Sequence, residues 1–312
     1  MKTLFVSPSY QCNESCVFCP CHKIHKNYYP IASEIIINSI IEAVQKENIE
    51  MILISGGEPT LYKDLIPIIT HAQQLKLKIG ILSNSLKFAN KDFYMSFINA
   101  IGNNFELTTA FHSNIAEEHD KITGIKGSFD RSLIGIKNLI NAGVHVTIKY
   151  IINKLSYNKI PEFANWIYTT FPNNVSWVIC GMDLCGEALI NSDLTAVAFD
   201  EFRKYLESAL DIVIEQSIKG NHRNVSIFNV PLCNIDPYYW RFLRKYESEE
   251  SMTALLLPSE DNQITPKIQY NLKGDGGANF SPCAKCLLKD SCPGTWRQTA
   301  EFFGDSIFNP FK

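Results

Sequence analysis

The chain has 312 residues and a net charge of −3, with 46% hydrophobic and 20% charged residues. This balance is typical of a globular protein with a buried core, and it excludes a disordered or collagen-like chain. Ten cysteines make up about 3% of the residues, well below the roughly 8–10% of a small disulfide-bonded scaffold. Because basic residues are not in excess, we expect no nucleic-acid partner.

The first residues, MKTLFVSPSYQC, contain one lysine and an apolar run too short for a secretory signal. No uninterrupted apolar stretch of about 18 residues occurs, so no membrane partner is expected. A chain without an export signal is expected in the reducing cytoplasm. Clustered cysteines there more often bind metal or take part in chemistry than form disulfides.

Six short segments rich in Ile, Val, Leu and Phe are predicted to be strands covered on both faces. They comprise residues 2–7, 51–55, 78–83, 105–111, 144–151 and 175–180. Amphipathic segments between them predict helices. The first helix is expected to have Ser33 as its N-cap and to bury a stripe of Ile36, Ile37, Ile40, Ile41 and Val44.

Further helices are predicted at residues 64–75, 91–101, 128–142 and 159–170, with Gly143 placed as a helix C-cap. About six βα units in sequence predict an α/β fold with a parallel sheet and right-handed crossovers. Six units are fewer than the eight of a closed barrel, so an open or partial barrel and a doubly wound sheet both fit. In either fold the functional site is expected at the carboxyl ends of the strands.

The last third of the chain has a different character. A helix at residues 199–218 and a strand at 225–230 precede a less periodic, cysteine-rich tail. We predict a core domain over residues 1–220 and a small appended domain over residues 221–312. The appended domain has little apolar core of its own, so it is expected to need a metal or the main domain for order.

Three cysteines follow the first predicted strand with the spacing C-x3-C-x2-C, at Cys12, Cys16 and Cys19. Three thiolates hold three irons of a [4Fe–4S] cluster and leave the fourth iron open to a small ligand. A zinc site or a set of buried cysteines is the alternative, because Cys21 and His22 extend the set of possible zinc ligands.

The second predicted strand runs into Gly56, Gly57, Glu58 and Pro59. Adjacent glycines permit close approach of the backbone to a ligand, and the Glu58 carboxylate is an acceptor for an ammonium group. Together with the cysteine triplet, this turn makes the sequence resemble the radical S-adenosylmethionine (radical SAM) superfamily. The resemblance covers residues 1–180.

The resemblance implies a partial (β/α)6 barrel with a small C-terminal cysteine-rich domain. It implies that the cysteine triplet holds the [4Fe–4S] cluster and that SAM chelates the open iron. The implied SAM contacts near the amino group are Gly56, Gly57, Glu58 and Pro59, and the implied contact near the adenine is Phe18. Asn84 is a further implied contact at the end of the third strand, where many members have Thr-Asn-Gly and this chain has Ser83-Asn84-Ser85.

The segments His119–Gly124 and Gly127–Arg131 resemble the part after strand four in molybdopterin-precursor cyclases and peptide maturases. That branch often has a serine near SAM on strand four, whereas this chain has Ala110. Thr109 or Ser113 is the expected substitute.

Four further cysteines, Cys233, Cys283, Cys286 and Cys292, can form a closed site for a [4Fe–4S] cluster or zinc. The C-x2-C-x5-C run resembles the auxiliary-cluster region of radical SAM maturases of the SPASM and twitch type, which implies a second [4Fe–4S] cluster. Cys180 or Cys185 can replace Cys233 as the fourth ligand, or the site can stay open for substrate.

Three cysteines have no assigned ligand role: Cys21, Cys180 and Cys185. Cys185 is a candidate hydrogen donor to a substrate radical, or a metal ligand, because it follows the sixth predicted strand. A buried small hydrophobe is the alternative for Cys180. His112, at the end of the fourth strand, is expected either to face the site or to be a core or surface histidine.

We therefore hypothesise that the protein is a radical SAM enzyme that forms a 5′-deoxyadenosyl radical. This radical is expected to abstract hydrogen from a ribosomally made precursor peptide, which leads to a cross-link, an epimerisation or another C–H change. A flavodoxin or ferredoxin is the expected electron donor. The first alternative is a small-molecule enzyme of the molybdopterin-precursor-cyclase type, although the chain ends Asn309-Pro310-Phe311-Lys312 and lacks the Gly-Gly tail of those cyclases. The alternative from another class is a non-catalytic iron–sulfur or zinc-binding protein.

Overall fold

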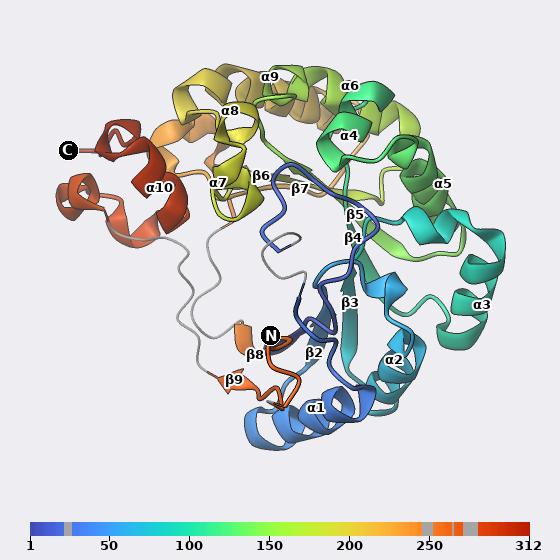
Figure 1. Ribbon diagram of the computed structural model, residues 1–312. Coiled ribbons are helices and arrows are strands. Elements are labelled where there is room, and N and C mark those ends of the chain that lie inside the picture. Colours follow the sequence, from blue (N-terminus) through green and yellow to red (C-terminus); the bar gives the residue numbers. More distant parts are fainter. Residues whose placement is uncertain (22–26, 245–251, 264, 271–279) are drawn as a thin grey trace.

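A computed structural model describes residues 1–21, 27–244, 252–263, 265–270 and 280–312. Within these residues the protein is built on one sheet of nine strands in the order β7-β6-β5-β4-β3-β2-β1-β8-β9. The strands β1 to β8 run parallel, and β9 is antiparallel to β8. No pairing joins β7 to β9 in the described chain, so the sheet curves without closing into a barrel (Figure 1).

The strands of the sheet are short, as is usual for parallel sheets with helical crossovers. They are β1 (Thr3–Val6), β2 (Met51–Ile54), β3 (Lys78–Leu82), β4 (Glu106–Ala110), β5 (His145–Ile151), β6 (Ser176–Cys180), β7 (Val225–Phe228), β8 (Met252–Leu256) and β9 (Gln269–Tyr270).

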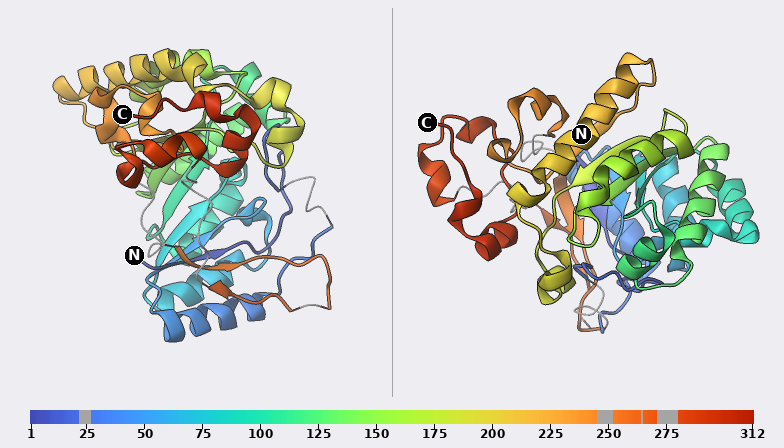
Figure 2. Two further views of the ribbon diagram at one scale, coloured as in Figure 1. Left: turned by 90° about the vertical axis from the view of Figure 1, so that its left-hand side faces the viewer. Right: turned by 90° about the horizontal axis from the view of Figure 1, so that it is seen from above.

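The helices lie outside the curved sheet and follow its strands in turn (Figures 1 and 2). They are α1 (Ser33–Glu47), α2 (Leu65–Gln74), α3 (Lys91–Ile101), α4 (Ala116–Thr123), α5 (Ser128–Asn141), α6 (Ile160–Thr170), α7 (Glu187–Ile190), α8 (Ser192–Thr195), α9 (Phe199–Ile218) and α10 (Arg297–Phe303). This arrangement confirms the predicted α/β class with an open, partial barrel.

The sheet extends beyond the six predicted βα units. Strand β7 pairs with β6, and β8 pairs with β1 from the other side. Part of the region predicted as an appended domain therefore supplies strands to the same sheet as the core. The domain boundary at residue 220 stays a prediction.

The start of the first helix differs from the prediction. Ala32, not Ser33, occupies the N-cap position, and no side chain caps this end. Ile31 before the cap and Ile36 in the first turn are both buried in the core, which is the arrangement of a hydrophobic staple and fixes where the chain enters the helix. The buried stripe is Ile36, Ser39, Ile40 and Ala43, so the predicted Ile37, Ile41 and Val44 are only partly buried.

The end of α5 agrees with its prediction more closely. Ala142 is the cap residue, and Gly143 follows it with a φ of 84°. A left-handed residue directly after a helix is commonly glycine, because glycine has no Cβ to clash.

The two faces of the sheet have different roles. On β5, Val146, Ile148 and Tyr150 are buried, and the Tyr150 ring lies 4.8 Å from the Phe163 ring of α6. The alternate residues of β5 point to the opposite, inner face, because side chains alternate along a strand. The core thus lies between the sheet and its helices, and the concave inner face is left for a site.

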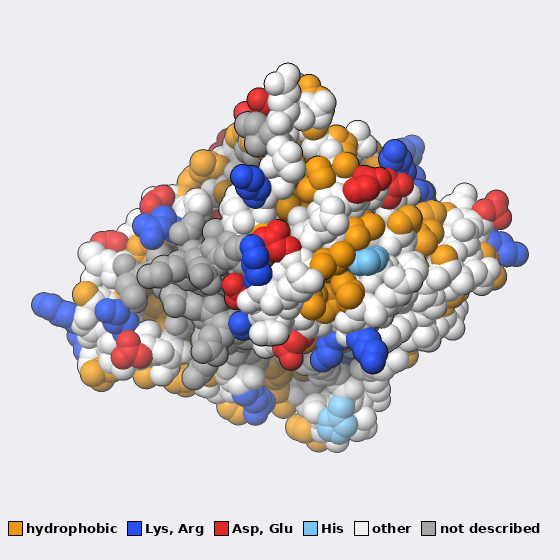
Figure 3. Space-filling model, turned by 90° about the horizontal axis from the view of Figure 1, so that it is seen from below, with side chains coloured by type: hydrophobic (Ala, Val, Ile, Leu, Met, Phe, Trp, Pro, Cys, Tyr) orange, Lys and Arg blue, Asp and Glu red, His pale blue; other side chains and the backbone are white. Residues whose placement is uncertain are grey.

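None of the helices among the described residues is long and apolar enough to cross a bilayer. On the face shown in Figure 3, basic and acidic side chains lie scattered among apolar and uncharged ones, without a continuous basic patch.

Candidate active site

The cysteine triplet lies on the loop that leaves the carboxyl end of β1, and this loop is joined to the Gly-Gly-Glu turn after β2. The backbone N–H of Gly57 donates to Ser9 O at 2.9 Å, and that of Glu58 donates to Gln11 O at 2.7 Å. A Cβ on Gly57 would stand 2.1 Å from the Gln11 carbonyl oxygen. The glycine is therefore required for the close approach of these two loops.

Position 56 also requires glycine, for reasons of its own. Its φ is 113°, and a Cβ there would lie 2.4 Å from both Ser7 Oγ and Ser9 O. The adjacent glycines predicted to approach a ligand thus pack directly against the cysteine loop. The two motifs, which are 37 to 47 positions apart in sequence, are thus held together through their backbones.

The other side of the cysteine loop is attached to α4 and α7. The backbone N–H groups of Ser15 and Val17 donate to Thr123 O and Ile122 O, both at 2.9 Å. Farther along, Glu187 N donates to Cys19 O at 3.1 Å. Three separate parts of the fold therefore hold the loop by main-chain bonds, which do not depend on the cysteine side chains.

The three thiols lie in a partly buried, acidic setting. Glu14 is 7% exposed; its N–H donates to Cys12 Sγ at 3.4 Å, and its carboxylate lies 3.5 Å from Cys16 Sγ. Burial raises the pKa of Cys12 to about 12 and that of Cys16 well above its ordinary value. Thiolates here need a positive charge nearby, and bound metal supplies one while it displaces the thiol protons.

The donor set fits an iron–sulfur cluster. The three thiols of Cys12, Cys16 and Cys19 lie on one short loop, and thiolates are the ligands that such clusters take. In a [4Fe–4S] cluster each thiolate binds a different iron, so its cysteines do not converge on one point. His22, the other residue of the zinc alternative, lies outside the described residues.

Glu58 is the most heavily hydrogen-bonded carboxylate of the site, and it is 3% exposed. Its Oε1 accepts from Thr60 N at 3.0 Å, Thr60 Oγ1 at 2.5 Å and Ser83 Oγ at 2.8 Å. Its Oε2 accepts from Asn84 N at 2.8 Å. Burial is the main influence on Glu58 and raises its pKa. Because a carboxylate has about four acceptor positions, two on each oxygen, the remaining capacity is on Oε2.

Asn84 links the end of β3 to the cysteine loop. Its Nδ2 donates to Asn13 Oδ1 at 2.7 Å, while its Oδ1 accepts from Leu86 N at 3.2 Å. Ser85 follows with a φ of 66°, a left-handed backbone that glycine adopts without strain. This conformation explains why the implied family pattern has glycine where this chain has Ser85.

Phe18 is 7% exposed and belongs to a small apolar cluster with Ile122, Met182 and Leu184. Its ring meets the His112 ring edge-on, with the centroids 4.9 Å apart. His112 is 1% exposed, so it lies inside the protein beside Phe18.

His119 and Asp120 have structural contacts in this region. His119 Nδ1 accepts from the His112 N–H at 3.2 Å. Asp120 accepts from Gly127 N at 2.5 Å and from Phe129 N at 2.9 Å, so its carboxylate caps the N-terminus of α5. The hydrogen bonds of Asp120 thus join the segments His119–Gly124 and Gly127–Arg131, and this explains why the two segments lie a fixed distance apart in the sequence.

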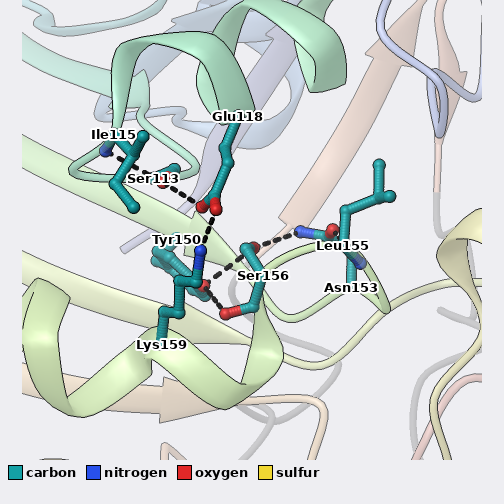
Figure 4. Close-up of polar contacts among 8 residues, drawn as sticks. All are labelled: Ser113, Ile115, Glu118, Tyr150, Asn153, Leu155, Ser156 and Lys159. Atoms are coloured by element: carbon teal, nitrogen blue, oxygen red, sulfur yellow. Dashed lines mark hydrogen bonds and ion pairs between the residues drawn. The ribbon is translucent and has the colours of Figure 1, made fainter.

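Thr109 and Ser113, the two expected substitutes for a strand-four serine, both have partners within the protein. Thr109 Oγ1 accepts from Ser85 Oγ at 3.0 Å, and Ser113 Oγ donates to Glu118 at 2.8 Å. Glu118 also pairs with Lys159, and nearby the Tyr150 hydroxyl donates to Ser156 O at 2.8 Å (Figure 4). These bonds connect the loops that follow β4 and β5.

The four C-terminal cysteines come together although they lie in separate short segments. Cys233, Cys283, Cys286 and Cys292 line one pocket, together with apolar residues that include Phe308 and Phe311. Cys292 Sγ accepts from the N–H groups of Leu232 and Gly294, both at 3.4 Å, and Asn234 Nδ2 lies 3.7 Å from Cys233 Sγ. N–H donors around several thiols fit the ligand shell of a cluster, whose sulfurs accept such bonds.

Cys180 is the last residue of β6, Cys185 lies on the segment between β6 and α7, and neither is among the residues that line that pocket. Cys180 is 6% exposed, and its Sγ donates to Gly181 O at 3.3 Å. Cys185 Sγ lies 3.4 Å from Asp183 Oδ2. Burial raises the pKa of Cys185 to about 12, followed by the neighbouring Asp183 carboxylate and, to a smaller extent, by Cys21 on the cysteine loop.

Asn229 attaches the tail to this segment, a role that the sequence analysis missed. Its Nδ2 donates to Gly181 O and Met182 O, both at 3.0 Å, while its Oδ1 accepts from Thr295 Oγ1 at 2.9 Å and Trp296 N at 2.7 Å. Its φ is 58°, which Asn tolerates better than most residues. The only signal in the sequence is Asn229 itself, placed directly after a strand.

Comparison with known proteins supports the same family. The model of the radical SAM superfamily matches residues 6–167, slightly more than half of the chain. Fe-coproporphyrin III synthase of Methanosarcina barkeri is 25% identical over 80% of this chain and 60% of its own length. A protein described as a probable GTP 3′,8-cyclase from Saccharolobus solfataricus is 27% identical over 52% of each chain. The chain thus spans about half to three-fifths of the length of these curated relatives.

Among solved structures, SuiB of Streptococcus suis bound to the precursor peptide SuiA has a TM-score of 0.65 and 15% identity, over 98% of this chain and 73% of SuiB. The structure of anSMEcpe with bound AdoMet and the Cp18Cys peptide has a TM-score of 0.59 and 15% identity, over 72% of this chain and 63% of that one. At such identities the similarity shows a shared fold.

Proposed function

Because the chain belongs to the radical SAM superfamily, we propose that it cleaves S-adenosylmethionine reductively and modifies a carbon of a ribosomally made peptide. The observation that supports this proposal most strongly is that the cysteine loop is hydrogen-bonded to, and packed against, the Gly-Gly-Glu turn at the carboxyl edge of the sheet. A cysteine loop that only carried electrons would not need this turn.

In this proposal Cys12, Cys16 and Cys19 hold a [4Fe–4S] cluster and leave one iron open. When bound, the cluster supplies the electron that cleaves SAM and so yields a 5′-deoxyadenosyl radical, which takes hydrogen from the substrate. The residues of the chain position SAM. The Glu58 Oε2 accepts from its ammonium, Gly56, Gly57 and Pro59 border that group, and Phe18 packs near the adenine.

Asn84 contributes to the proposed SAM site through the cysteine loop, because its side chain is hydrogen-bonded to Asn13. Ser113 is the proposed substitute for the strand-four serine at Ala110. Its hydroxyl donates to Glu118 and has acceptor capacity left for a ligand, since a hydroxyl offers two acceptor positions. Thr109, the other expected substitute, is aligned with Ile148 on the helix-facing side of the sheet and is fully buried, so its side chain does not face the site on the inner side.

We propose that Cys233, Cys283, Cys286 and Cys292 hold a second [4Fe–4S] cluster. The support is their common pocket and the N–H groups near Cys233 and Cys292. A flavodoxin or ferredoxin is the proposed electron donor. None of the ten cysteines is in a disulfide, and the cytoplasmic location stays the expectation from the sequence.

The proposed peptide substrate has its support in the fold shared with SuiB, whose structure contains a precursor peptide. Cys185 is the proposed hydrogen donor for a substrate radical. Its high pKa keeps the sulfur protonated at neutral pH, and only a protonated thiol has a hydrogen atom to give. A Cys185→Ser variant in D2O should lose deuterium incorporation into product while 5′-deoxyadenosine formation continues.

A small-molecule substrate is the second candidate. It is favoured by the 25% identity to Fe-coproporphyrin III synthase over 80% of this chain. The two candidates differ in which substrate increases the formation of 5′-deoxyadenosine by the reduced holoenzyme.

The experiment is to incubate the anaerobically reconstituted, reduced protein with SAM and with either candidate precursor peptides or an iron-porphyrin-type precursor of Fe-coproporphyrin III, the compound that the relative is named for making. A peptide that gains or loses hydrogen in step with 5′-deoxyadenosine supports the proposal. Turnover of the porphyrin alone would replace it with the second candidate. A matched reaction with the Cys12→Ala variant controls for chemistry caused by the reductant.

A further inference from the structure

The inner face of the sheet holds a lysine, Lys149, for which the described residues provide no ion-pair partner. Lys149 is on β5 and points to the same face as Thr147 and Ile151, away from α6. In the register of the sheet its neighbours are Ala110 on β4 and Val178 on β6. It is half-buried and lies two residues before the carboxyl end of its strand.

Among the described residues, no acidic side chain lies within ion-pair distance of Lys149. Lys149 acts electrostatically on two neighbouring groups, His112 and Cys180, and the Asp183 carboxylate acts on the same Cys180 thiol. Burial lowers the pKa of the first and raises that of the second, so both are neutral at neutral pH.

The strand neighbours of Lys149 on its face of the sheet are uncharged, and several of them are apolar. The same face of the neighbouring strands presents Leu82, Val178 and Phe228, with Thr108, Thr147, Ser176 and Ser226 as neutral polar side chains. A lone ammonium on such a surface is partly desolvated without a partner, and this is unfavourable unless an anion joins it. An aliphatic group that ends in a carboxylate matches both the charge and the apolar surroundings.

We propose that Lys149 binds a carboxylate of the substrate and orients the carbon chain next to it toward the site at the carboxyl ends of the strands. For the proposed peptide this carboxylate is an acidic side chain or the C-terminus. The identification of a peptide rests on the proposed function, whereas the preference for a carboxylate rests on Lys149 and its surroundings.

The test is calorimetric titration of the reconstituted holoenzyme, with SAM present, with two matched pairs of probes. One pair is hexanoate and hexanamide, and the other is a peptide with a single central Glu or Gln. The wild type should bind each carboxylate about 10- to 100-fold more tightly than its amide, since bonds to charged groups are worth that much. Lys149→Met and Lys149→Gln should lose the preference, and Lys149→Arg should keep much of it.

Lys137→Met is the matched control, because this lysine is exposed on α5 outside the sheet. An unchanged carboxylate preference in both neutral Lys149 variants would overturn the proposal. So would a loss of SAM binding in both variants, because Lys149 would then serve the SAM carboxylate or the integrity of the site.

The same measurements separate this proposal from the peptide hypothesis. If hexanoate binding depends on Lys149 but no peptide increases 5′-deoxyadenosine formation, the carboxylate site stands and the peptide substrate fails. If a peptide is turned over equally well by the wild type and both neutral variants, the peptide hypothesis stands and Lys149 has no role in substrate binding.

Discussion

The two groups of cysteines differ in how the protein holds them. The N-terminal loop is bonded through its main chain to the Gly-Gly-Glu turn, α4 and α7. The C-terminal group is spread over short 3-10 segments such as Ser281–Lys285 and Lys289–Ser291, with Leu287 between them 76% exposed. The fold alone thus positions the first site, whereas the second depends more on a bound ligand.

The largest expected effect is the loss of SAM cleavage on removal of one N-terminal thiol. In Cys16→Ala the loop keeps its main-chain bonds, so the fold should survive while the proposed cluster loses a ligand. We expect 5′-deoxyadenosine formation to fall below detection and the melting temperature of the apoprotein to change little. A variant that retains activity would show that Cys16 is not a ligand.

Gly57→Ala tests the packing of the cysteine loop against the Gly-Gly-Glu turn and leaves every cysteine in place. The new Cβ would stand 2.1 Å from Gln11 O, so the loop must move. A displacement of about 1 Å can reduce the rate roughly 100-fold, and steady-state 5′-deoxyadenosine formation measures it. Gly220→Ala is the control, since it has the strain of a φ of 87° but no atom within 4 Å of its Cβ. Equal effects in both variants would contradict the explanation.

Cys233→Ala applies the thiol test to the second site. We expect the iron content to fall from about eight to about four per chain and the tail after β9 to become more sensitive to limited proteolysis. Elemental analysis measures the metal. Four irons and one zinc in the wild type would disprove the second cluster.

Asn229→Ala tests how the tail is attached to the barrel. The substitution leaves Trp296 N without its partner and removes one of the two hydrogen bonds at Gly181 O and at Met182 O, which keep Cys180 Sγ and Thr299 Oγ1. Buried groups left unpaired cost about 1–3 kcal/mol each, and partial relaxation should bring the total loss of unfolding free energy to about 3 kcal/mol. Urea denaturation of the apoprotein measures this loss. Asn229→Gly separates the lost bonds from the left-handed backbone, because glycine retains only the latter.

The smallest effect, counted per pH unit, is a pH dependence at His119, whose ring lies beside those of Phe111 and His112. Burial lowers the pKa of His119 from 6.5 to about 4, so the folded protein keeps this side chain neutral while the unfolded chain takes up a proton below about pH 6.5. Stability should therefore be lost as the pH falls from about 6.5 toward 4, by at most about 1.4 kcal/mol per pH unit for this group. In His119→Asn, urea titrations across this range should show a smaller slope, and an unchanged slope would contradict the account.

The sequence was sufficient to predict the parts of the molecule that have strong local patterns. The apolar strands, the amphipathic helices α3 and α9, the cysteine spacing and the Gly-Gly-Glu turn are all visible in short windows. Strand β8 was missed because its apolar run stands alone, without a helix before it, and its pairing with β1 spans most of the chain.

Residues whose role depends on distant partners were also beyond prediction. Asn229 is an ordinary polar residue in the sequence, and only the fold brings Gly181 and Trp296 to its amide. Lys149 has an inconspicuous place in an alternating strand, and its lack of an ion-pair partner among the described residues emerges only when β4 and β6 are placed beside it.

The central claim is that the fold prepares the N-terminal cysteine loop for a cluster that cleaves SAM, independently of the tail. The most direct test is the formation of 5′-deoxyadenosine from SAM by the reduced, reconstituted Cys283→Ala/Cys286→Ala variant, which retains the N-terminal triplet. We predict about four irons per chain and continued formation of 5′-deoxyadenosine. A variant with these four irons bound that forms no 5′-deoxyadenosine, while the wild type does, would contradict the claim.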